Sequence, residues 1–257
     1  MRLVTFLRPD KAAAAGVLID ADRFIIDLEL ATGSAIFRTV QGLIEAGAEA
    51  WAEARAAVAA APPRALRPCS EAVLLSPLPV PVQLRDFASF EAHSSAAGKR
   101  TLPRVWYDQP VYYKCNRFAV SGPDSIVEWP AGSKSIDYEL ELAVVIGPGG
   151  KDISAERAMD HVFGYTIFND LSARDWQFRE MEVGLGPARG KDFDGANALG
   201  PCIVTADEVS DPYALQMVAR VNGQEWSRNC VGTIHHRIDR MISFASESQT
   251  LHAGEIF

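Results

Sequence analysis

The sequence lacks the features that mark several common protein classes. Its four cysteines are far apart and form no Cys-x-x-Cys pair, which disfavours a zinc site and fits a reducing compartment. It has no basic excess, because the net charge is −8, so neither nucleic acid nor an acidic membrane surface is an expected partner. No segment approaches the ~20 apolar residues that cross a bilayer, and the N-terminal apolar run is too short for a signal peptide. We therefore expect a cytoplasmic protein that binds small molecules.

Nucleotide-binding and serine-hydrolase motifs are also missing. The Gly-rich stretch Gly184–Asp192 fails as a phosphate loop, because Asp192 follows Lys191 where Ser or Thr is needed and the first glycine is out of register. It fails as a dinucleotide fingerprint as well, because no strand and helix flank it. No Gly-x-Ser-x-Gly elbow occurs. These absences leave chemistry based on acidic side chains.

The chain is long enough for a large domain with a small one beside it. Short strands at 3–7, 15–20 and 24–27 precede an Ala-rich helical pattern over 35–61, with Gly47 as its weak point and Pro62-Pro63 as its end. We place a domain boundary near residue 70, which gives a small domain at 1–70 and a catalytic domain at 71–257. Later segments predict strands at 162–168, 198–205 and 215–221, and a helix over 233–248 that carries His235 and His236.

The stretch Ser135–Gly147 is the most informative part of the chain. Its Leu, Ala, Val and Ile residues predict a buried strand, yet Glu139 and Glu141 lie inside it at alternate positions. Since successive strand side chains point to opposite faces, both carboxylates share one face. Two like charges in a dry interior need a cation between them. The alternatives are a metal site and an edge strand whose glutamates face solvent, and the pattern leaves both open.

Other segments carry candidate site residues that have ordinary explanations. A helix predicted over Arg85–Gly98 carries Asp86 and His93, and a lone histidine is more often a surface or core residue than a catalyst. The predicted strand at 162–168 delivers Asp170 at its end, where site residues often lie. Arg174 follows four residues later, and a surface ion pair between the two is the simplest reading.

Four segments taken together resemble the fumarylacetoacetate hydrolase family, and their order and spacing agree over residues 80–257. They are Asp86-Phe-(x)5-His93, Asp-Tyr-Glu139-Leu-Glu141-Leu, Asn169-Asp170-Leu-Ser-Ala-Arg174-Asp-x-Gln177 and Gly190-Lys191-Asp-Phe-Asp. The resemblance implies an α+β, mostly β fold, with a mixed β-sandwich or roll as the catalytic domain and a small N-terminal α/β domain. It also implies a homodimer.

The resemblance further assigns roles to individual residues. It implies that Glu139, Glu141 and Asp170 bind a divalent ion, Mg²⁺, Mn²⁺ or Ca²⁺, with Asp86 as a fourth or water-mediated ligand. Hard cations of this kind prefer oxygen ligands. By the same resemblance, the catalytic residues are His93, as the base that activates water, and Lys191, beside developing oxyanion charge. The substrate-orienting residues are Tyr113, Arg174 and Gln177.

Two departures from the family pattern concern the substrate. The segment from Gly98 to Tyr113 is shorter than in the mammalian hydrolase. The turn after Gln177 is not aromatic where that enzyme has a tyrosine, and Met181 is nearby. The family pattern also continues beyond the Gly-Glu-Ile motif at 254–256 into a strand and loop. We expect that C-terminal strand and loop to be missing from this sequence.

The leading hypothesis is a metal-dependent hydrolase that cleaves a carbon–carbon bond in a 1,3-dicarbonyl acid of the fumarylacetoacetate or acylpyruvate type. The ion would stabilise the leaving enolate. One alternative uses the same site for decarboxylation of oxaloacetate-like acids or isomerisation of unsaturated dicarboxylates. Another is a non-catalytic binding domain. In each case the expected partner is a small oxo acid.

Overall fold

The computed structural model describes residues 1–96 and 98–257. Its main feature is a nine-stranded sheet with the strand order β10-β11-β13-β1-β2-β3-β4, in which β5 also pairs with β1 and β8 with β13. Its strands are β1 (Arg2–Leu7), β2 (Ala13–Ile19), β3 (Phe24–Asp27), β4 (Leu66–Pro68), β5 (Val73–Leu75), β8 (Val120–Ser121), β10 (Leu140–Ile146), β11 (Val162–Asp170) and β13 (Asn197–Thr205). The predicted α+β, mostly β construction is confirmed.

The remaining strands form three small two-stranded sheets, and the helices are mostly short. The strands are β6 (Arg85–Phe87) with β7 (Tyr112–Lys114), β9 (Ile136–Asp137) with β12 (Ser172–Ala173), and β14 (Gln216–Val221) with β15 (Gln224–Cys230). The α-helices are α1 (Leu28–Thr32), α2 (Val40–Ala60), α3 (Glu91–Ser94), α4 (Arg104–Asp108), α5 (Ala155–Ala158), α6 (Arg174–Met181) and α7 (Ile238–Ser246). The 3-10 helices are η1 (Ala35–Arg38), η2 (Pro63–Ala65), η3 (Cys69–Glu71), η4 (Met159–His161), η5 (Ala206–Glu208), η6 (Pro212–Ala214) and η7 (Val231–Thr233).

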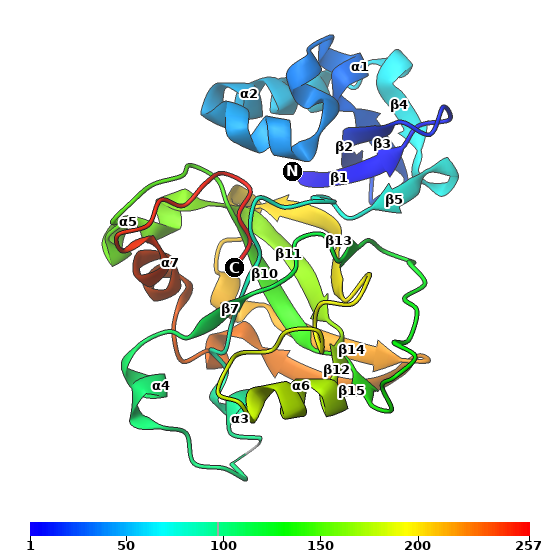
Figure 1. The fold of residues 1–257 in the computed structure, drawn as a ribbon. Helices are drawn as coiled ribbons and strands as arrows, with labels where there is room; N and C mark the ends of the chain where they lie inside the picture. Colours follow the sequence, from blue (N-terminus) through cyan, green and yellow to red (C-terminus); the bar gives the residue numbers. More distant parts are fainter. Residues whose placement is uncertain (97) are drawn as a thin grey trace.

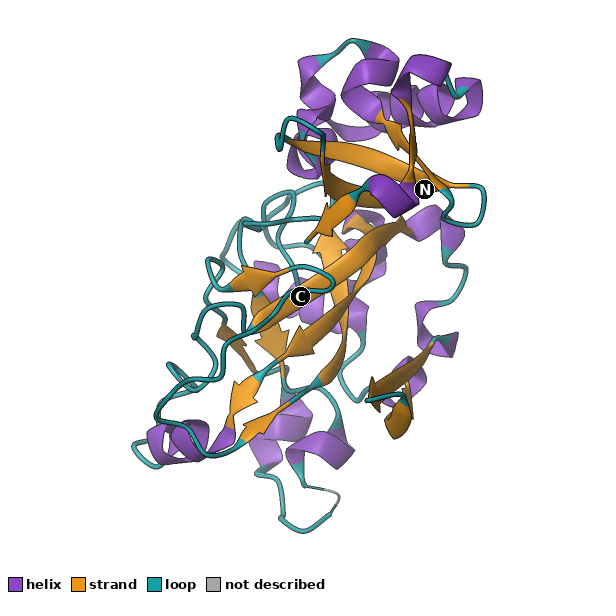
Figure 2. Cartoon of the chain, turned by 90° about the vertical axis from the view of Figure 1, so that its right-hand side faces the viewer, coloured by secondary structure: helices purple, strands orange, loops and turns teal. Residues whose placement is uncertain are grey.

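The N-terminal residues form the upper lobe in Figure 1, with helices over one side of strands β1 to β3 (Figure 2). Helix α2 begins where the side chain of Thr39 accepts a hydrogen bond from the Gly42 amide at 2.9 Å. Gly47 interrupts it with φ 77°, a left-handed conformation that glycine adopts without a Cβ clash. The helix stops at Ala60, just before Pro62-Pro63. The predicted helix and its weak point are both confirmed.

The two parts of the chain share one sheet. Strand β1 pairs antiparallel with β13, and Leu3 lies opposite Ile203. Strand β5, which lies beyond residue 70, pairs with β1 as well. Backbone hydrogen bonds therefore cross the predicted boundary near residue 70. The division into domains at 1–70 and 71–257 stays a prediction.

Several predicted elements around the site differ from the structure. Residues 85–98 are not one helix: Arg85–Phe87 is a strand, because it pairs with Tyr112–Lys114. Of the residues described in this range, only Glu91–Ser94 is helical. The strand predicted over 135–147 is broken into β9 and β10, because Ile136–Asp137 pairs with Ser172–Ala173 instead.

The C-terminal helix is shorter than predicted. It begins at Ile238, so His235 and His236 precede it, and the His236 ring binds the Trp106 carbonyl oxygen at 2.7 Å. The hairpin at Asn222-Gly223 is confirmed by the pairing of β14 with β15. Among the described residues, no helix has both the length and the apolarity that a bilayer crossing requires.

Candidate functional site

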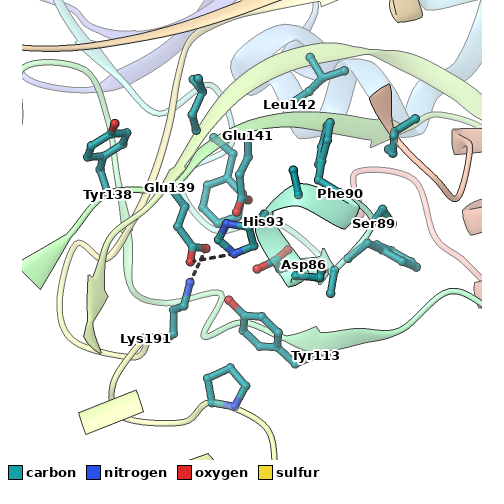
Figure 3. Close-up of a pocket in the computed structure, with 18 of the residues that line it drawn as sticks. Asp86, Ser89, Phe90, His93, Tyr113, Tyr138, Glu139, Glu141, Leu142 and Lys191 are labelled. Carbon is teal, nitrogen blue, oxygen red and sulfur yellow. Dashed lines mark hydrogen bonds and ion pairs between the residues drawn. The ribbon is translucent and has the colours of Figure 1, made fainter. Parts of the chain in front are cut away.

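Four carboxylates converge at one end of strands β10 and β11. Each of Asp86, Glu139, Glu141 and Asp170 offers an oxygen, and these oxygens all lie within 4.8 Å of one another. Glu139 directly precedes β10 and Glu141 lies inside it, while Asp170 ends the neighbouring strand β11. Strand β6 brings Asp86 from the other side (Figure 3). The predicted metal-ligand set is thus brought together in space.

The backbone pattern explains why the two glutamates meet. Glu139 and Glu141 are two residues apart on an extended segment, so their side chains leave the same face. In the register of β10 with β11, Leu140 lies opposite Asn169, which places Asp170 beside the glutamates. The Glu139 amide also donates to the Asn169 side chain at 3.2 Å.

Removal from water and mutual repulsion shape the charge of this cluster. Burial raises the pKa of Glu141 well above its usual range, and the nearby carboxylates of Asp86 and Glu139 raise it further. Burial likewise raises the pKa of Asp86. For Asp170, burial raises the pKa to about 7 despite the opposing charge of Lys191. Such groups hold protons unless a cation replaces them.

Glu139 behaves differently because two cations contact it. Burial by itself raises its pKa, but Lys191 and Arg174 outweigh burial and lower the pKa to about 2. Lys191 Nζ lies 2.6 Å from Glu139 Oε2 and 2.6 Å from Asp170 Oδ2, and its side chain is only 2% exposed. Arg174 donates to Glu139 through Nη1 and to Asp137 through Nε at 2.9 Å. The predicted catalytic lysine lies at the centre of the cluster.

Lys191 is held in place by the helix that precedes its loop. The Glu180 carboxylate on α6 accepts hydrogen bonds from the amides of Ala188 and Gly190, at 3.0 and 3.2 Å. A Cβ on Gly190 would lie 2.7 Å from the Gln177 amide nitrogen, so only glycine allows this close approach. Sequence reasoning missed Glu180, which lies outside the family motifs.

The remaining predicted residues surround the carboxylates. Tyr113 on β7 donates its hydroxyl to Asp170 Oδ2, and burial raises its pKa so that it stays a donor. Gln177 Oε1 accepts from Arg174 Nη1 at 3.1 Å. His93 on α3 points toward the cluster, with Nε2 at 3.6 Å from Glu139 Oε1 (Figure 3). Its side chain is 62% exposed, so the ring can reach a bound molecule.

Sequence reasoning also missed Asp137. The predicted surface ion pair between Asp170 and Arg174 does not form; Arg174 instead binds Asp137 and Glu139, while Asp170 binds Lys191. Asp137 stands two residues before Glu139 in the same motif, so the alternation that revealed the two glutamates could have revealed it. It orients Arg174 at the edge of the cluster.

These side chains fit a hard divalent cation. The donor set is oxygen only, as such ions prefer. Asp170 Oδ1 is buried and has no hydrogen-bond partner within the described residues, although buried polar atoms nearly always have one. Four carboxylates also outnumber the two cations that bind them, Lys191 and Arg174. A divalent ion would supply both the missing partner and the missing charge.

Asp86, Glu139 and Glu141 line a pocket of about 680 Å³, while Asp170 is fully buried. The polar lining of the pocket beyond the cluster includes His93 and Gln177, and it also includes Ser227 and Arg228 from β15. Phe90, Leu142 and Phe168 add apolar surface. The volume suits a small, polar molecule with one apolar side.

The sequence is similar to known proteins of one family. The family described as "Fumarylacetoacetate (FAA) hydrolase C-terminal" matches residues 84–257. The mitochondrial oxaloacetate tautomerase Fahd2a of Rattus norvegicus is 31% identical over 264 residues, which covers 100% of this chain and 79% of that protein. The mitochondrial oxaloacetate tautomerase fahd2 of Xenopus laevis is 41% identical over 151 residues, 58% of this chain and 46% of that protein.

Solved structures show the same fold. Maleylpyruvate hydrolase from Sphingobium sp. SYK-6, in complex with manganese(II) ion and pyruvate, has a TM-score of 0.77 and 28% identity, covering 100% of this chain and 86% of that chain. The 5-carboxymethyl-2-hydroxymuconate delta-isomerase of Mycobacterium smegmatis has a TM-score of 0.73 and 26% identity, with 100% and 86% covered. The predicted fold is confirmed, and the chain belongs to the fumarylacetoacetate hydrolase family.

Proposed function

We propose that this chain is a divalent-metal-dependent enzyme that interconverts the keto and enol forms of 2-oxo dicarboxylic acids. The observation that carries the proposal is the convergence of four carboxylates, three of which line the pocket. A 2-oxo acid offers two adjacent oxygens that bind a hard cation together. Oxaloacetate is the first substrate to test, because the relatives from Rattus norvegicus and Xenopus laevis are named for it.

Asp86, Glu139, Glu141 and Asp170 would hold the ion, which we propose to be Mg²⁺, Mn²⁺ or Ca²⁺. When bound, it would act as a Lewis acid that stabilises the negative charge on the enolate oxygen. The manganese and pyruvate named in the Sphingobium structure support an ion and a ligand of this kind.

His93 would move the proton at the carbon next to the oxo group. Its ring is exposed to the pocket and lies at the edge of the carboxylate cluster, within reach of a molecule bound there. Proton transfer by a positioned side chain is worth ~10²–10⁴ in rate. We therefore assign His93 as the catalytic acid and base.

Lys191 would stabilise the negative charge that develops on the oxo oxygen. Its ammonium is buried and fixed by Glu139 and Asp170, so it is oriented before the reaction begins. Arg174 and Gln177 are proposed to orient the carboxylate of the substrate. Tyr113, a proposed substrate-binding residue, also fixes Asp170 through its hydroxyl.

Hydrolysis of a carbon–carbon bond in an acylpyruvate is the second candidate. The same enolate would leave, and the similarity to maleylpyruvate hydrolase supports it. Hydrolysis also requires a base that is oriented toward water. Within the described residues, His93 forms an ion pair with Glu139, which is itself a proposed metal ligand, and with no other carboxylate that would orient its ring toward water. This favours proton transfer on carbon over activation of water, and isomerisation of an unsaturated dicarboxylate fits the same site.

Assembly and compartment are further proposals. We propose a homodimer, as expected for the family, and light scattering of the purified protein tests it. A cytoplasmic location is proposed from the sequence, although the rat and frog relatives are named as mitochondrial. The net charge of −8 continues to favour small molecules over nucleic acid or membrane lipid as partners.

An assay panel tests the function. The Mn²⁺-loaded protein should speed the approach to keto–enol equilibrium of oxaloacetate, followed by the enol absorbance, and His93→Ala should abolish the effect. Turnover of acylpyruvates with loss of the enol signal would favour the hydrolase. Decarboxylation of oxaloacetate, seen as pyruvate release, would favour the decarboxylase. No turnover of any of them would favour a binding domain.

A further inference from the structure

A buried ion pair lies directly beside the metal-ligand cluster. Arg85 and Glu255 are 2% and 3% exposed, and Arg85 Nη1 binds Glu255 Oε2. Burying two charges costs several kcal/mol per ion before their attraction is counted, so such a pair is weak evidence for stability. Arg85 immediately precedes Asp86, the carboxylate that joins the cluster from strand β6. Its position indicates a function other than stability.

The segment that carries Glu255 connects the two strands that present the ligands. On one side, Ile146 N donates to Glu255 O at 2.8 Å, and Phe257 exchanges two hydrogen bonds with Val144, at 2.8 and 2.9 Å. Val144 and Ile146 belong to β10, the strand of Glu141. On the other side, Arg85 N donates to Ile256 O at 2.9 Å. Residues 254–257 therefore set the separation between the strand of Asp86 and the strand of Glu141.

The side chains of the pair are themselves fixed. The guanidinium of Arg85 lies over the rings of Phe257 and Tyr112, at 5.2 and 5.7 Å from their centroids. Glu255 Oε1 accepts a hydrogen bond from the His252 amide at 3.1 Å. Each partner is thus held by contacts in addition to the ion pair itself. The pair joins β6 to residues 254–257 in one geometry.

We propose that the Arg85–Glu255 pair is a positioning device for the fourth metal ligand, Asp86. It rests on the metal site of the proposed function. Asp86 places an oxygen within 4.8 Å of the oxygens of Glu139, Glu141 and Asp170, and only strand β6 brings it there, so this strand must be held for the four carboxylates to stay together. The pair supplies that restraint, and its two residues are positioning residues that do not contact the ion.

The test measures Mn²⁺ affinity by calorimetry in four variants. Glu255→Gln keeps the side-chain size and removes the charge, and we expect a ~10–100-fold loss of affinity, as for groups that orient metal ligands. Asp86→Asn should give a similar loss. The double variant Asp86→Asn/Glu255→Gln should bind no more weakly than Asp86→Asn alone, because the pair acts through Asp86. Arg85→Met/Glu255→Leu replaces the pair by apolar side chains. Such a replacement often leaves stability unchanged, so this variant is tested if Glu255→Gln does not fold.

The outcomes separate this inference from the proposed function. If the wild-type protein binds no Mn²⁺, both fail. If the wild type binds Mn²⁺ and Glu255→Gln binds it equally well, only the positioning role fails. If Glu255→Gln does not fold, the same comparison is made with Arg85→Met/Glu255→Leu. Additive losses in the double variant would also overturn the positioning role. The control is Asp27→Asn, which breaks a buried ion pair in the N-terminal lobe and should leave Mn²⁺ affinity unchanged.

Discussion

Two clusters of charged side chains within the described residues, the Asp27–Arg8 pair of the N-terminal lobe and the metal-ligand cluster, differ in how their buried acids are balanced. In the N-terminal lobe, Asp27 is fully buried and both of its oxygens bind Arg8, at 2.7 and 2.8 Å. Asp27 also caps helix α1 by accepting from the Leu30 amide at 3.1 Å. In the metal-ligand cluster, Asp170 is equally buried, yet its Oδ1 has no partner within the described residues. A saturated acid stabilises the fold, whereas an unsaturated one is available to a ligand.

Removal of two carboxylates from the pocket should have the largest effect. Glu139→Gln/Glu141→Gln replaces two of the four clustered oxygen donors by neutral amides. We expect Mn²⁺ affinity to fall by ~100-fold or more and turnover to disappear, and calorimetry measures the first. The fold should stay intact by circular dichroism, because Lys191 keeps Asp170 and Arg174 keeps Asp137 as a partner. Unchanged Mn²⁺ binding would remove the basis of the contrast between the clusters.

Removal of the proton-transfer group should spare the metal site. His93→Asn keeps a polar side chain at the edge of the pocket but removes the imidazole ring. We expect kcat for oxaloacetate tautomerisation to fall by ~10²–10⁴. Mn²⁺ affinity should stay within about threefold of the wild type, since His93 is no proposed ligand. A parallel loss of kcat and metal affinity would instead assign His93 to the metal.

A change in the N-terminal cluster should affect stability alone. Asp27→Asn removes the charge that binds Arg8 and leaves that guanidinium partly unpaired. We expect the free energy of unfolding to fall by about 2 kcal/mol, measured by urea titration. Activity per folded molecule should not change. If Mn²⁺ affinity dropped as well, the two clusters would be coupled through the sheet that joins β1 to β13.

The pH dependence of stability should separate the clusters more finely. In the metal-free protein, Asp170 has its pKa raised to about 7, so its contribution to stability is present at low pH and is lost as the pH rises through that value. Metal binding requires the deprotonated carboxylate, so Mn²⁺ affinity should be roughly 30-fold lower at pH 5.5 than at pH 8. The rise in Tm on adding Mn²⁺ should therefore be larger at pH 8. An equal rise at both pH values would contradict the assignment of Asp170.

The two clusters were not equally visible in the sequence. The glutamates at 139 and 141 break an apolar run with a period of two. This local signal predicts their common face, and it leaves a metal site and a solvent-facing edge strand as alternatives. Asp170 follows from its place at the end of a predicted strand. Asp27 gave no signal, because its partner Arg8 is on another strand and the pairing depends on tertiary structure.

Long-range pairing explains the predictions that were wrong. The helix predicted over Arg85–Gly98 included Asp86. Residues 85–87 instead form a strand, because they pair with strand β7, more than twenty residues later in the chain. The break between β9 and β10 arises in the same way, from pairing with residues 172–173. Glu255 lies 170 residues from Arg85, so no local pattern could join them. The sequence could therefore predict which carboxylates lie in the cluster, but not the distant residues that hold their strands in place.

A crystal structure of the protein grown with Mn²⁺ and oxalate tests the central claim most directly. Oxalate stands in for a 2-oxo acid, and the anomalous signal of manganese locates the ion without reference to the surrounding density. The account predicts one Mn²⁺ bound by oxygens of Glu139, Glu141 and Asp170, with Asp86 bound directly or through water and oxalate facing His93. An ion elsewhere, or a cluster that stays bound to Lys191 and Arg174 alone in the presence of saturating Mn²⁺, would contradict it.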